Sequence, residues 1–234
     1  MSRCPVLRHS PPARPQDEWV GTMVRIGLVA LLACFAIGQP AAHAAVTPAI
    51  LVNDTNKVPG CVKPDRLMEF IGKRNKSLDP RFQDVARLYQ SHGREVGVRW
   101  DYAFFQMIVE TSSLKYKTGS GRWGDVKPKQ NNFVGLGATG GGEPGESFPD
   151  VSTGVLAHLH HIRLYSGEPV ENPAANRTKL VEDLILPWSR GIGRPVTFTD
   201  LTSKWSPTDK GYSDDIESVA KSYRSQFCTK DEEE

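Results

Sequence analysis

Residues 103–109 read Ala-Phe-Phe-Gln-Met-Ile-Val, with Gln106 as the single polar side chain, and Glu110 follows directly. A helix that is apolar on nearly every side has no face suited to water, so neighbouring elements must cover it all round. Asp101 is placed to open such a helix, and the polar residues 111–113 are placed to end it. The sequence therefore predicts a central, buried helix whose C-terminal end carries an acid.

The position of Glu110 indicates acid catalysis. Hydrocarbon beside a carboxyl group disfavours the charged form, and an acid that keeps its proton near neutral pH can protonate a leaving group. Gln106 lies one turn earlier on the same helix face. The alternative is a solvated glutamate at a helix end that pairs with Lys115 or Lys117.

Four segments are expected along the chain. Residues 1–44 have the layout of a secretory leader, with an apolar stretch from about Met23 and a small-residue cleavage site ending at Ala44. Either Met1 or Met23 is the true start, and a membrane anchor is the alternative, although the apolar stretch is short for a span. Residues 45–60 are expected to form a linker, 61–228 the folded domain, and 229–234 a solvated acidic tail.

The cysteines predict a disulfide. Cys4 and Cys34 lie in the expected leader, which leaves Cys61 and Cys228 near the two ends of the remaining chain. An oxidising compartment favours a bond between two such thiols, and closing a very long loop gives a large stabilisation in the chain-entropy model. We therefore expect a periplasmic or secreted protein with no membrane span once the leader is removed.

The rest of the chain is mostly helical in pattern. Helices are expected from Asp65, from Asp79-Pro80, from Asp150 or Ser152, around 180–186 up to Pro187, and from Asp214. Residues 118–147 are rich in glycine and polar side chains, which is typical of a long functional loop or a small β region. The predicted fold class is α+β, mostly α, of the lysozyme kind.

Four blocks of sequence resemble the glucosaminidase domain of glycoside hydrolase family 73, a branch of the lysozyme-like superfamily. The resemblance spans roughly residues 67–227, and the blocks occur in the order found in the family. The first is Glu110-Thr111 after an apolar helix, and the second is residues 131–140, Asn-Asn-Phe-Val-Gly-Leu-Gly-Ala-Thr-Gly. The third is Phe148-Pro149 before Gly154-Val155 and residues 161–165, and the fourth is residues 205–209, Trp-Ser-Pro-Thr-Asp, with Tyr212. Ser112 stands where the family usually has glycine. The resemblance implies a hydrolase of bacterial cell-wall glycan.

Under this resemblance Glu110 matches the general acid, and Tyr212 matches a tyrosine that faces the acid across the sugar cleft. The asparagine-rich and glycine-rich block matches the cleft floor. We expect the following residues to contact substrate: Gln106, Trp123, Asn131, Asn132, Phe133, Gly135 and His161.

The sequence offers three carboxylates as candidates for a second catalytic group. The family places a second carboxylate, where one is assigned, in the polar excursion, which makes Glu143 and Glu146 candidates and Asp150 a third. Two glutamates that merely solvate a glycine-rich turn are the alternative. The 2-acetamido group of the substrate can also replace a protein nucleophile.

Several other classes of function are disfavoured. Without the leader, the chain carries equal numbers of cationic and anionic side chains, so a surface that follows nucleic-acid phosphates is not supported. The Gly135-x-Gly137-x-x-Gly140 pattern follows no hydrophobic strand and precedes no helix, as a dinucleotide site requires. His158, His160 and His161 lack acidic or cysteine partners at metal-ligand spacing. No cofactor or metal is expected.

The sequence therefore predicts a monomeric endo-β-N-acetylglucosaminidase that acts on peptidoglycan strands. Three alternatives stay open: a muramidase or lytic transglycosylase on the same glycan, a non-catalytic glycan-binding module, and a secreted structural protein.

Overall fold

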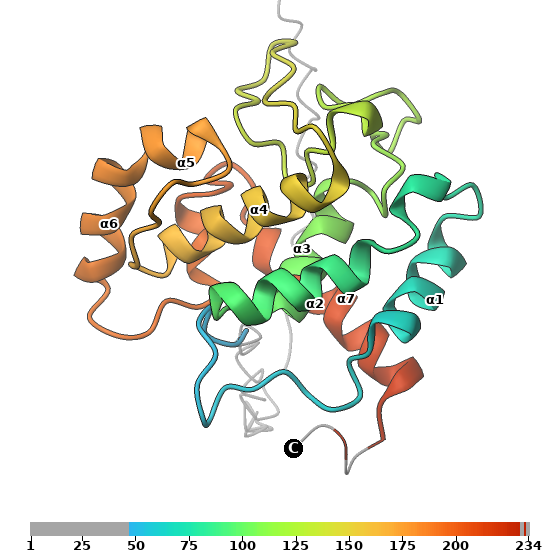
Figure 1. The fold of residues 1–234 in the computed structure, drawn as a ribbon, viewed down its shortest axis with the longest axis horizontal. Helices are drawn as coiled ribbons and strands as arrows, with labels where there is room; N and C mark the ends of the chain where they lie inside the picture. The colour runs from blue at the N-terminus through green and yellow to red at the C-terminus, as the bar shows by residue number, and fades with distance from the viewer. Residues whose placement is uncertain (1–46, 230–231, 233–234) are drawn as a thin grey trace, which may run out of the picture. The chain divides into compact units, whose positions relative to one another are not determined.

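The computed structural model describes residues 47–229 and 232, and this part of the chain is mostly helical (Figure 1). The expected leader and most of the acidic tail lie outside the described residues. The helices are α1 (Pro64–Arg74), α2 (Val85–Val96), α3 (Trp100–Glu110), α4 (Val151–Tyr165), α5 (Asn176–Leu180), α6 (Glu182–Gly191) and α7 (Tyr212–Phe227). Short 3₁₀ turns lie at Pro80–Phe82, Pro128–Gln130 and Asp200–Ser203.

Helix α3 lies at the centre of these helices, in contact with α2, α4 and α7 (Figure 1). Every residue from Trp100 to Ile108 is buried, as the apolar run predicts. Asp101 does not cap the helix from outside but lies in its first turn, where it is buried against Arg99, with N–O distances of 2.8 and 2.6 Å. This pairing satisfies a charge that would otherwise be costly to bury.

Two glycines allow close contacts around this centre. A Cβ on Gly93 of α2 would lie 2.2 Å from the Cβ of Trp100, and a Cβ on Gly154 of α4 would lie 1.9 Å from the carbonyl oxygen of Asn131. Carbon atoms cannot approach this closely, so only glycine permits these helix positions. Gly154 therefore lets α4 pack directly on the loop that carries Asn131.

The β part of the predicted fold is smaller than expected. Pairing between extended segments in the described part of the chain is limited to isolated bridges, such as Lys117 with Trp123 and Ala49 with Thr197. Residues 118–147 form a loop region with many glycines at positive φ, among them Gly137 and Gly145. Such backbone does not continue a ladder, so this region is held by side-chain bonds to the backbone instead.

Several expected helix boundaries were wrong. The helix expected from Asp79-Pro80 is instead a 3₁₀ turn at Pro80–Phe82, capped by Asp79, and α2 begins only at Val85. Pro187 lies inside α6 and does not end it. The residues beyond it pack inward, because the Ser189 hydroxyl is buried and lies 2.9 Å from both the Ile185 and the Tyr165 carbonyl oxygens, and this contact with α4 offsets the lost backbone bond at proline. Helix α7 begins at Tyr212, two residues before the expected Asp214.

The described part of the expected linker belongs to the folded unit. Ile50 is fully buried, its backbone N–H donates to Val196 at 2.8 Å, and its carbonyl accepts from Arg99 at 2.7 Å. Residues 47–60 therefore pack on the helices because an apolar side chain in this segment reaches the core, and they do not form a free connection.

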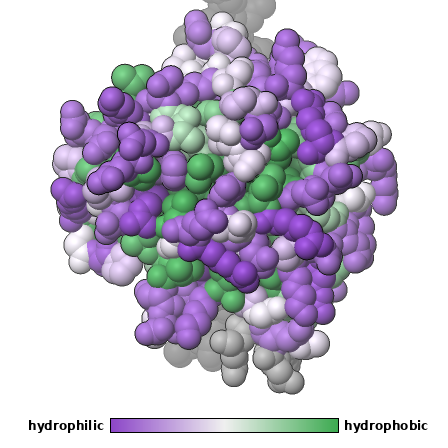
Figure 2. All heavy atoms as spheres, in the orientation of Figure 1, coloured by the Kyte–Doolittle hydropathy of each residue, from purple (hydrophilic) through white to green (hydrophobic). Residues whose placement is uncertain are grey.

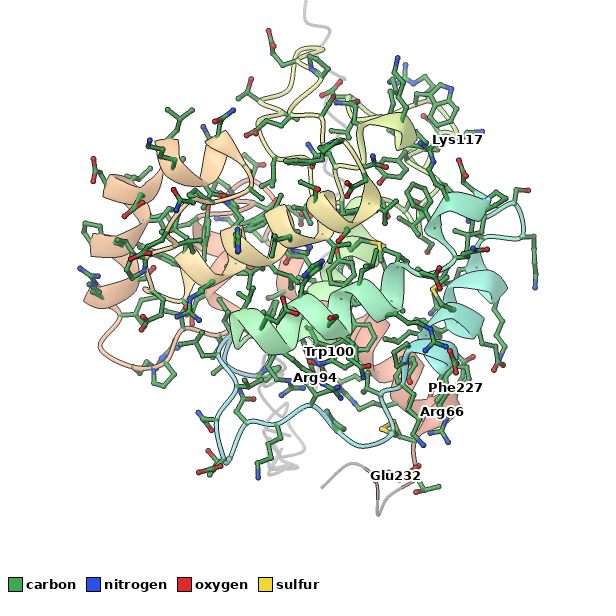
Figure 3. The ribbon with its side chains drawn as sticks, viewed as in Figure 1. Arg66, Arg94, Trp100, Lys117, Phe227 and Glu232 are labelled. Carbon is green, nitrogen blue, oxygen red and sulfur yellow. A yellow bond between two sulfur atoms is a disulfide. The ribbon has the colours of Figure 1, made fainter. Side chains whose placement is uncertain are left out.

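The predicted disulfide is confirmed. Cys61 and Cys228 are bonded, with a Cα–Cα distance of 5.2 Å. Figure 3 shows Arg66, Phe227 and Glu232 gathered near this end of the domain, where the Arg66 guanidinium donates to the Phe227 carbonyl at 2.7 Å and lies 3.7 Å from a Glu232 carboxylate oxygen. The bond and these contacts hold the two ends of the domain together.

Hydrophilic side chains predominate on the face shown in Figure 2, and hydrophobic ones appear in patches between them. Among the residues that the structure describes, no helix has the length and hydrophobicity to cross a membrane.

Candidate active site

Glu110 ends α3 beside two hydrogen-bond donors from the C-terminal part of the chain. Its Oε1 accepts from the Tyr212 hydroxyl at 2.5 Å and from the Trp205 indole N–H at 2.9 Å. These donors are far away in sequence, but α7 packs against α3, and this brings Tyr212 to the end of the central helix. Two of the family-like blocks thus meet at the acid.

The two carboxylate oxygens of Glu110 have different surroundings. Oε1 accepts both hydrogen bonds, whereas Oε2 has no hydrogen-bond partner among the described residues. When Glu110 is neutral, its proton therefore resides on Oε2, because a proton on Oε1 would compete with two donors. The proton is then carried by the oxygen that the protein leaves free.

The surroundings of Glu110 favour this neutral form. The pKa of Glu110 is raised to about 7 as the net result of opposing effects: burial raises it, the hydrogen bonds from Tyr212 and Trp205 lower it, and the nearby charge of Asp209 raises it. More than a third of the residue's surface is nevertheless open to solvent, because the side chain lines a cleft. The carboxyl group is thus packed among protein atoms on one side and accessible to a ligand on the other.

The cleft consists of two hollows that meet at Glu110. The first has a volume of about 430 Å³ and is lined by Tyr116 and Lys117, and the second has a volume of about 330 Å³ and is lined by Arg177 and Trp205. Glu110, Asp125 and Gly135 line both. A chain-like ligand can therefore extend to both sides of the acid.

A buried row of hydrogen bonds lies behind Tyr212. The Gln106 amide donates to the Tyr212 hydroxyl at 2.6 Å, and its carbonyl oxygen lies 3.1 Å from His158 Nε2. His158 Nδ1 lies 2.8 Å from the Tyr89 hydroxyl. Gln106 was expected to contact substrate, but it is fully buried and reaches the cleft only through Tyr212. The reason is that its helix face turns towards α4 and α7.

The asparagine-rich block mainly builds the cleft floor from within. The Asn132 amide donates to the Leu136 and Glu146 carbonyls at 2.9 and 3.0 Å, and the Asn131 amide donates to the Phe148 carbonyl at 3.0 Å. Their amide nitrogens are therefore occupied by the loop itself. Asn132 lines the first hollow, whereas Asn131 lines neither hollow.

Some of the other residues expected to contact substrate line the hollows, and one does not. Phe133 is buried among core rings but touches the first hollow, and Gly135 lies at the junction of both hollows with a φ of 69°. His161 lines the second hollow, and its Nδ1 lies 2.9 Å from the Thr178 hydroxyl oxygen. Trp123 lies outside both hollows with 54% of its surface exposed, beside Gly124, which lines the first.

The expected second carboxylates do not lie at the cleft. The Glu146 carboxylate accepts from the backbone N–H groups of Asn176 and Arg177 at 2.9 and 2.6 Å, so it holds the start of α5. Asp150 caps α4 by accepting from Thr153 at 2.7 Å. Glu143 is exposed in the glycine-rich loop and lines neither hollow. Helix starts attract carboxylates because their N–H groups are unpaired.

Sequence reasoning missed two residues of the site. The sequence marks Trp205 only as part of the block at 205–209 and gives it no role, yet its indole N–H donates a hydrogen bond to Glu110. Asp125 was not considered, yet it shares both hollows with Glu110. The family-like block at 205–209 marks Trp205, but no pattern in the sequence distinguishes Asp125 from the other polar residues of its loop.

Ser112, in the turn after the acid, adopts a backbone conformation that glycine favours. Its φ is 51°, in the left-handed region that glycine favours, and Ser113 follows with a φ of 60°. The Thr111 hydroxyl donates to the Met107 carbonyl at 2.7 Å and accepts from the Leu114 N–H at 2.8 Å. These bonds hold the turn in a conformation that serine alone disfavours.

Within residues 47–229 and 232, no group of three or more histidine, cysteine or acidic side chains is arranged to hold a metal ion. His158 and His161 bond to protein hydroxyls, and burial lowers the pKa of each to about 3. Both rings are therefore neutral parts of the packed structure.

The fold and site together define a mostly helical, disulfide-closed domain with a partly desolvated acid in a two-sided cleft. No family model matches the chain, and no solved structure matches it. The chain is 30% identical over 161 residues to an uncharacterized protein of Borreliella burgdorferi, and the matched region covers 68% of this chain and 72% of that protein. The chain belongs to the same family as this spirochaete protein.

Proposed function

We propose that this protein cleaves β-1,4 glycosidic bonds of bacterial peptidoglycan with Glu110 as the general acid. The observation that carries the proposal is the state of this carboxyl group. Its pKa is raised to about 7, and its Oε2, at the junction of the two hollows, has no hydrogen-bond partner in the part of the chain that the structure describes. A glycosidase must deliver a proton to the oxygen between two sugars. An acid with sugar-sized space on both sides meets this requirement.

The fold supports the same function. A lysozyme-like arrangement has a central buried helix with the acid at its end and a polar loop region across the cleft, and α3, Glu110 and residues 118–147 correspond to these parts. The disulfide supports a periplasmic or secreted location, where the glycan substrate lies.

The substrate itself supplies the second catalytic group in this proposal. Asp125 shares the cleft, but it is exposed, and its carboxylate has no hydrogen bond or ion pair among the described residues that would aim it. Asp209 lies near Glu110, but one of its oxygens accepts from the Gly211 N–H at 3.0 Å. The 2-acetamido group of an N-acetylated sugar can instead attack the developing cation internally.

The first candidate is an endo-β-N-acetylglucosaminidase, on the strength of the family resemblance. The second candidate is a lytic transglycosylase, and the specific observation that favours it is the position of Glu143 and Glu146 away from the acid. A transglycosylase needs no second carboxylate, because a hydroxyl of the sugar itself closes an anhydro ring. A muramidase is the hydrolytic variant on the same linkage.

Digestion of purified sacculi tests the proposal. Wild-type protein should release soluble fragments, and Glu110→Gln should release none while still folding and binding sacculi. Glu69→Gln on the exposed face of α1 is the matched control and should keep full activity. Fragments ending in reducing N-acetylglucosamine indicate the first candidate, and anhydro ends indicate the second. Binding of wild type without any release would refute catalysis and leave a glycan-binding module.

A further inference from the structure

The hydrogen bonds behind Tyr212 have one consistent direction. Tyr212 donates to Glu110, so its oxygen accepts from the Gln106 amide, and the Gln106 carbonyl must accept from His158 Nε2. A neutral histidine carries one proton, so Nδ1 is an acceptor and the Tyr89 hydroxyl donates to it.

All of the residues in this row behind the acid are shielded from solvent. Tyr89, Gln106 and His158 are fully buried, and Tyr212 is 4% exposed. They belong to four different helices: α2, α3, α4 and α7. Water cannot replace a lost partner there, so each hydroxyl or amide depends on the next for its orientation.

We propose that Tyr89 and His158 are positioning residues that fix the direction of this row and thereby keep the Tyr212 hydroxyl donating to Glu110. The Tyr89 hydroxyl, at the end of the row away from Glu110, sets the direction of the other hydrogen bonds. The Tyr89 hydroxyl is buried and has no other hydrogen-bond partner among the described residues, so its proton must go to His158 Nδ1. His158 then holds its own proton on Nε2, and that proton fixes the orientation of the Gln106 amide. With the amide nitrogen facing Tyr212, the tyrosine hydroxyl can donate only to the acid.

Loss of the Tyr89 hydroxyl releases this constraint. His158 can then carry its proton on Nδ1, the Gln106 amide can turn over, and Tyr212 can donate to Gln106 instead of Glu110. A hydrogen bond from Tyr212 favours the charged carboxylate. Its partial loss therefore shifts the titration of Glu110 to higher pH, although the substituted atom is four hydrogen bonds away.

Other charges around Glu110 stay unchanged in this comparison. Three groups of titratable or charged side chains share its surroundings or its hollows: the carboxylates of Asp209 and Asp125; the cations of Lys117, Arg177 and Lys204; and the neutral side chains of Tyr116, Tyr165, Tyr212 and His161, the last of which also neighbours His158. None of them is altered when Tyr89 becomes phenylalanine, so a shift reports the row itself.

The test is a carbon-13 NMR titration of the Glu110 carboxyl group in the intact protein, assigned by its absence in Glu110→Gln. Tyr89→Phe should raise the titration midpoint and lower kcat on sacculi roughly tenfold, the effect of about one charge-assisted hydrogen bond. Tyr223→Phe is the matched control, because it also removes one buried hydroxyl, which donates to the Cys61 carbonyl at 3.0 Å. It should leave the midpoint unchanged.

Two variants at His158 separate positioning from packing. His158→Gln keeps one acceptor and one donor at similar spacing and should retain the wild-type midpoint, whereas His158→Leu should raise it as Tyr89→Phe does. Equal midpoints in wild type, Tyr89→Phe and His158→Leu overturn the inference. The inference rests on the proposed role of Glu110 as the acid, but the titration needs no turnover. A wild type that cuts no glycan therefore refutes the function alone, and an unmoved midpoint refutes the row alone.

Discussion

The indole N–H of Trp205 lies 2.9 Å from Oε1 of Glu110, the same oxygen that accepts from Tyr212. Trp205 is also packed against the rings of His161 and Tyr165, with centroid distances of 5.1 and 5.2 Å. The indole is therefore fixed by α4 while it bonds to the end of α3. Trp205 also lines the second hollow, so this hydrogen bond connects Glu110 with that hollow and lowers the pKa of the Glu110 carboxyl group.

The activity of the proposed enzyme should depend on the proton of Glu110. With a pKa of about 7, the acid is protonated below neutral pH, so kcat/KM on sacculi should be high there and fall above pH 7. Trp205→Phe removes a bond that lowers the pKa, and it should move this fall to higher pH. Asp209→Asn removes a charge that raises the pKa, and it should move the fall to lower pH. Shifts in the same direction for both variants would contradict this account.

The unfolding free energy should also depend on pH through the protonation of Glu110. The folded-state pKa of Glu110 lies above its ordinary value of 4.5, so its stabilising contribution is complete below about pH 4.5 and is lost as pH rises to about 7. The difference in unfolding free energy between wild type and Glu110→Gln should therefore fall over this range and then stay constant. Urea titrations at pH 4.5, 6 and 8 measure it. His158 and His161 are present in both proteins, so their effects cancel.

Replacing Asp125 should cost little if the substrate supplies the second catalytic group. Asp125→Asn keeps the size of the side chain and removes its charge, and we expect a loss in kcat of less than about tenfold. The comparison is Glu110→Gln, which should lose all measurable turnover. A loss of comparable size in Asp125→Asn would instead identify this carboxylate as a base, and the proposed substrate assistance would then be wrong.

The sequence predicted the central features of the fold because they follow from local pattern. The apolar run before Glu110 indicates a buried helix wherever it packs, and two cysteines near the ends of one domain have an obvious partner in each other. Pro187 shows the limit of such reasoning. Local propensity predicts a helix end there, but burial beyond the proline, which sequence pattern does not show, outweighs it.

The site was harder to predict than the fold. The family-like blocks mark both Glu110 and Tyr212, and the structure brings these two side chains into direct hydrogen-bond contact. Glu146 was considered for catalysis because it is a carboxylate in the right loop, but its two oxygens bond to the start of α5, a partner about 30 residues away that the sequence does not reveal. The hydrogen-bond row ending at Tyr89 depends on four helices meeting and could not be predicted from spacing.

The disulfide should contribute strongly to stability. It joins residues 167 positions apart, and closing so long a loop restricts the unfolded chain, which is worth about 2–5 kcal/mol. The unfolding free energy of the double variant Cys61→Ala, Cys228→Ala should be lower by about this amount, which urea unfolding shows as a lower midpoint. Reduced wild type should match the double variant, and the same midpoint in oxidised and reduced protein would contradict the prediction.

Gly154 should prove indispensable for the cleft floor. A methyl group there would collide with the Asn131 carbonyl at 1.9 Å and press on the Phe133 ring at 3.1 Å, so α4 and the loop must separate. Gly154→Ala should therefore destabilise the protein by about 1–3 kcal/mol or more, as overpacking does, and reduce activity by displacing Phe133 from the first hollow.

Gly72→Ala is the matched control within α1, where a Cβ meets no atom within 4 Å. It should stabilise the protein by about 0.5–1 kcal/mol, because alanine favours a helix. Opposite signs for the two substitutions in urea unfolding would support the contact between α4 and Asn131, and a neutral Gly154→Ala would exclude it.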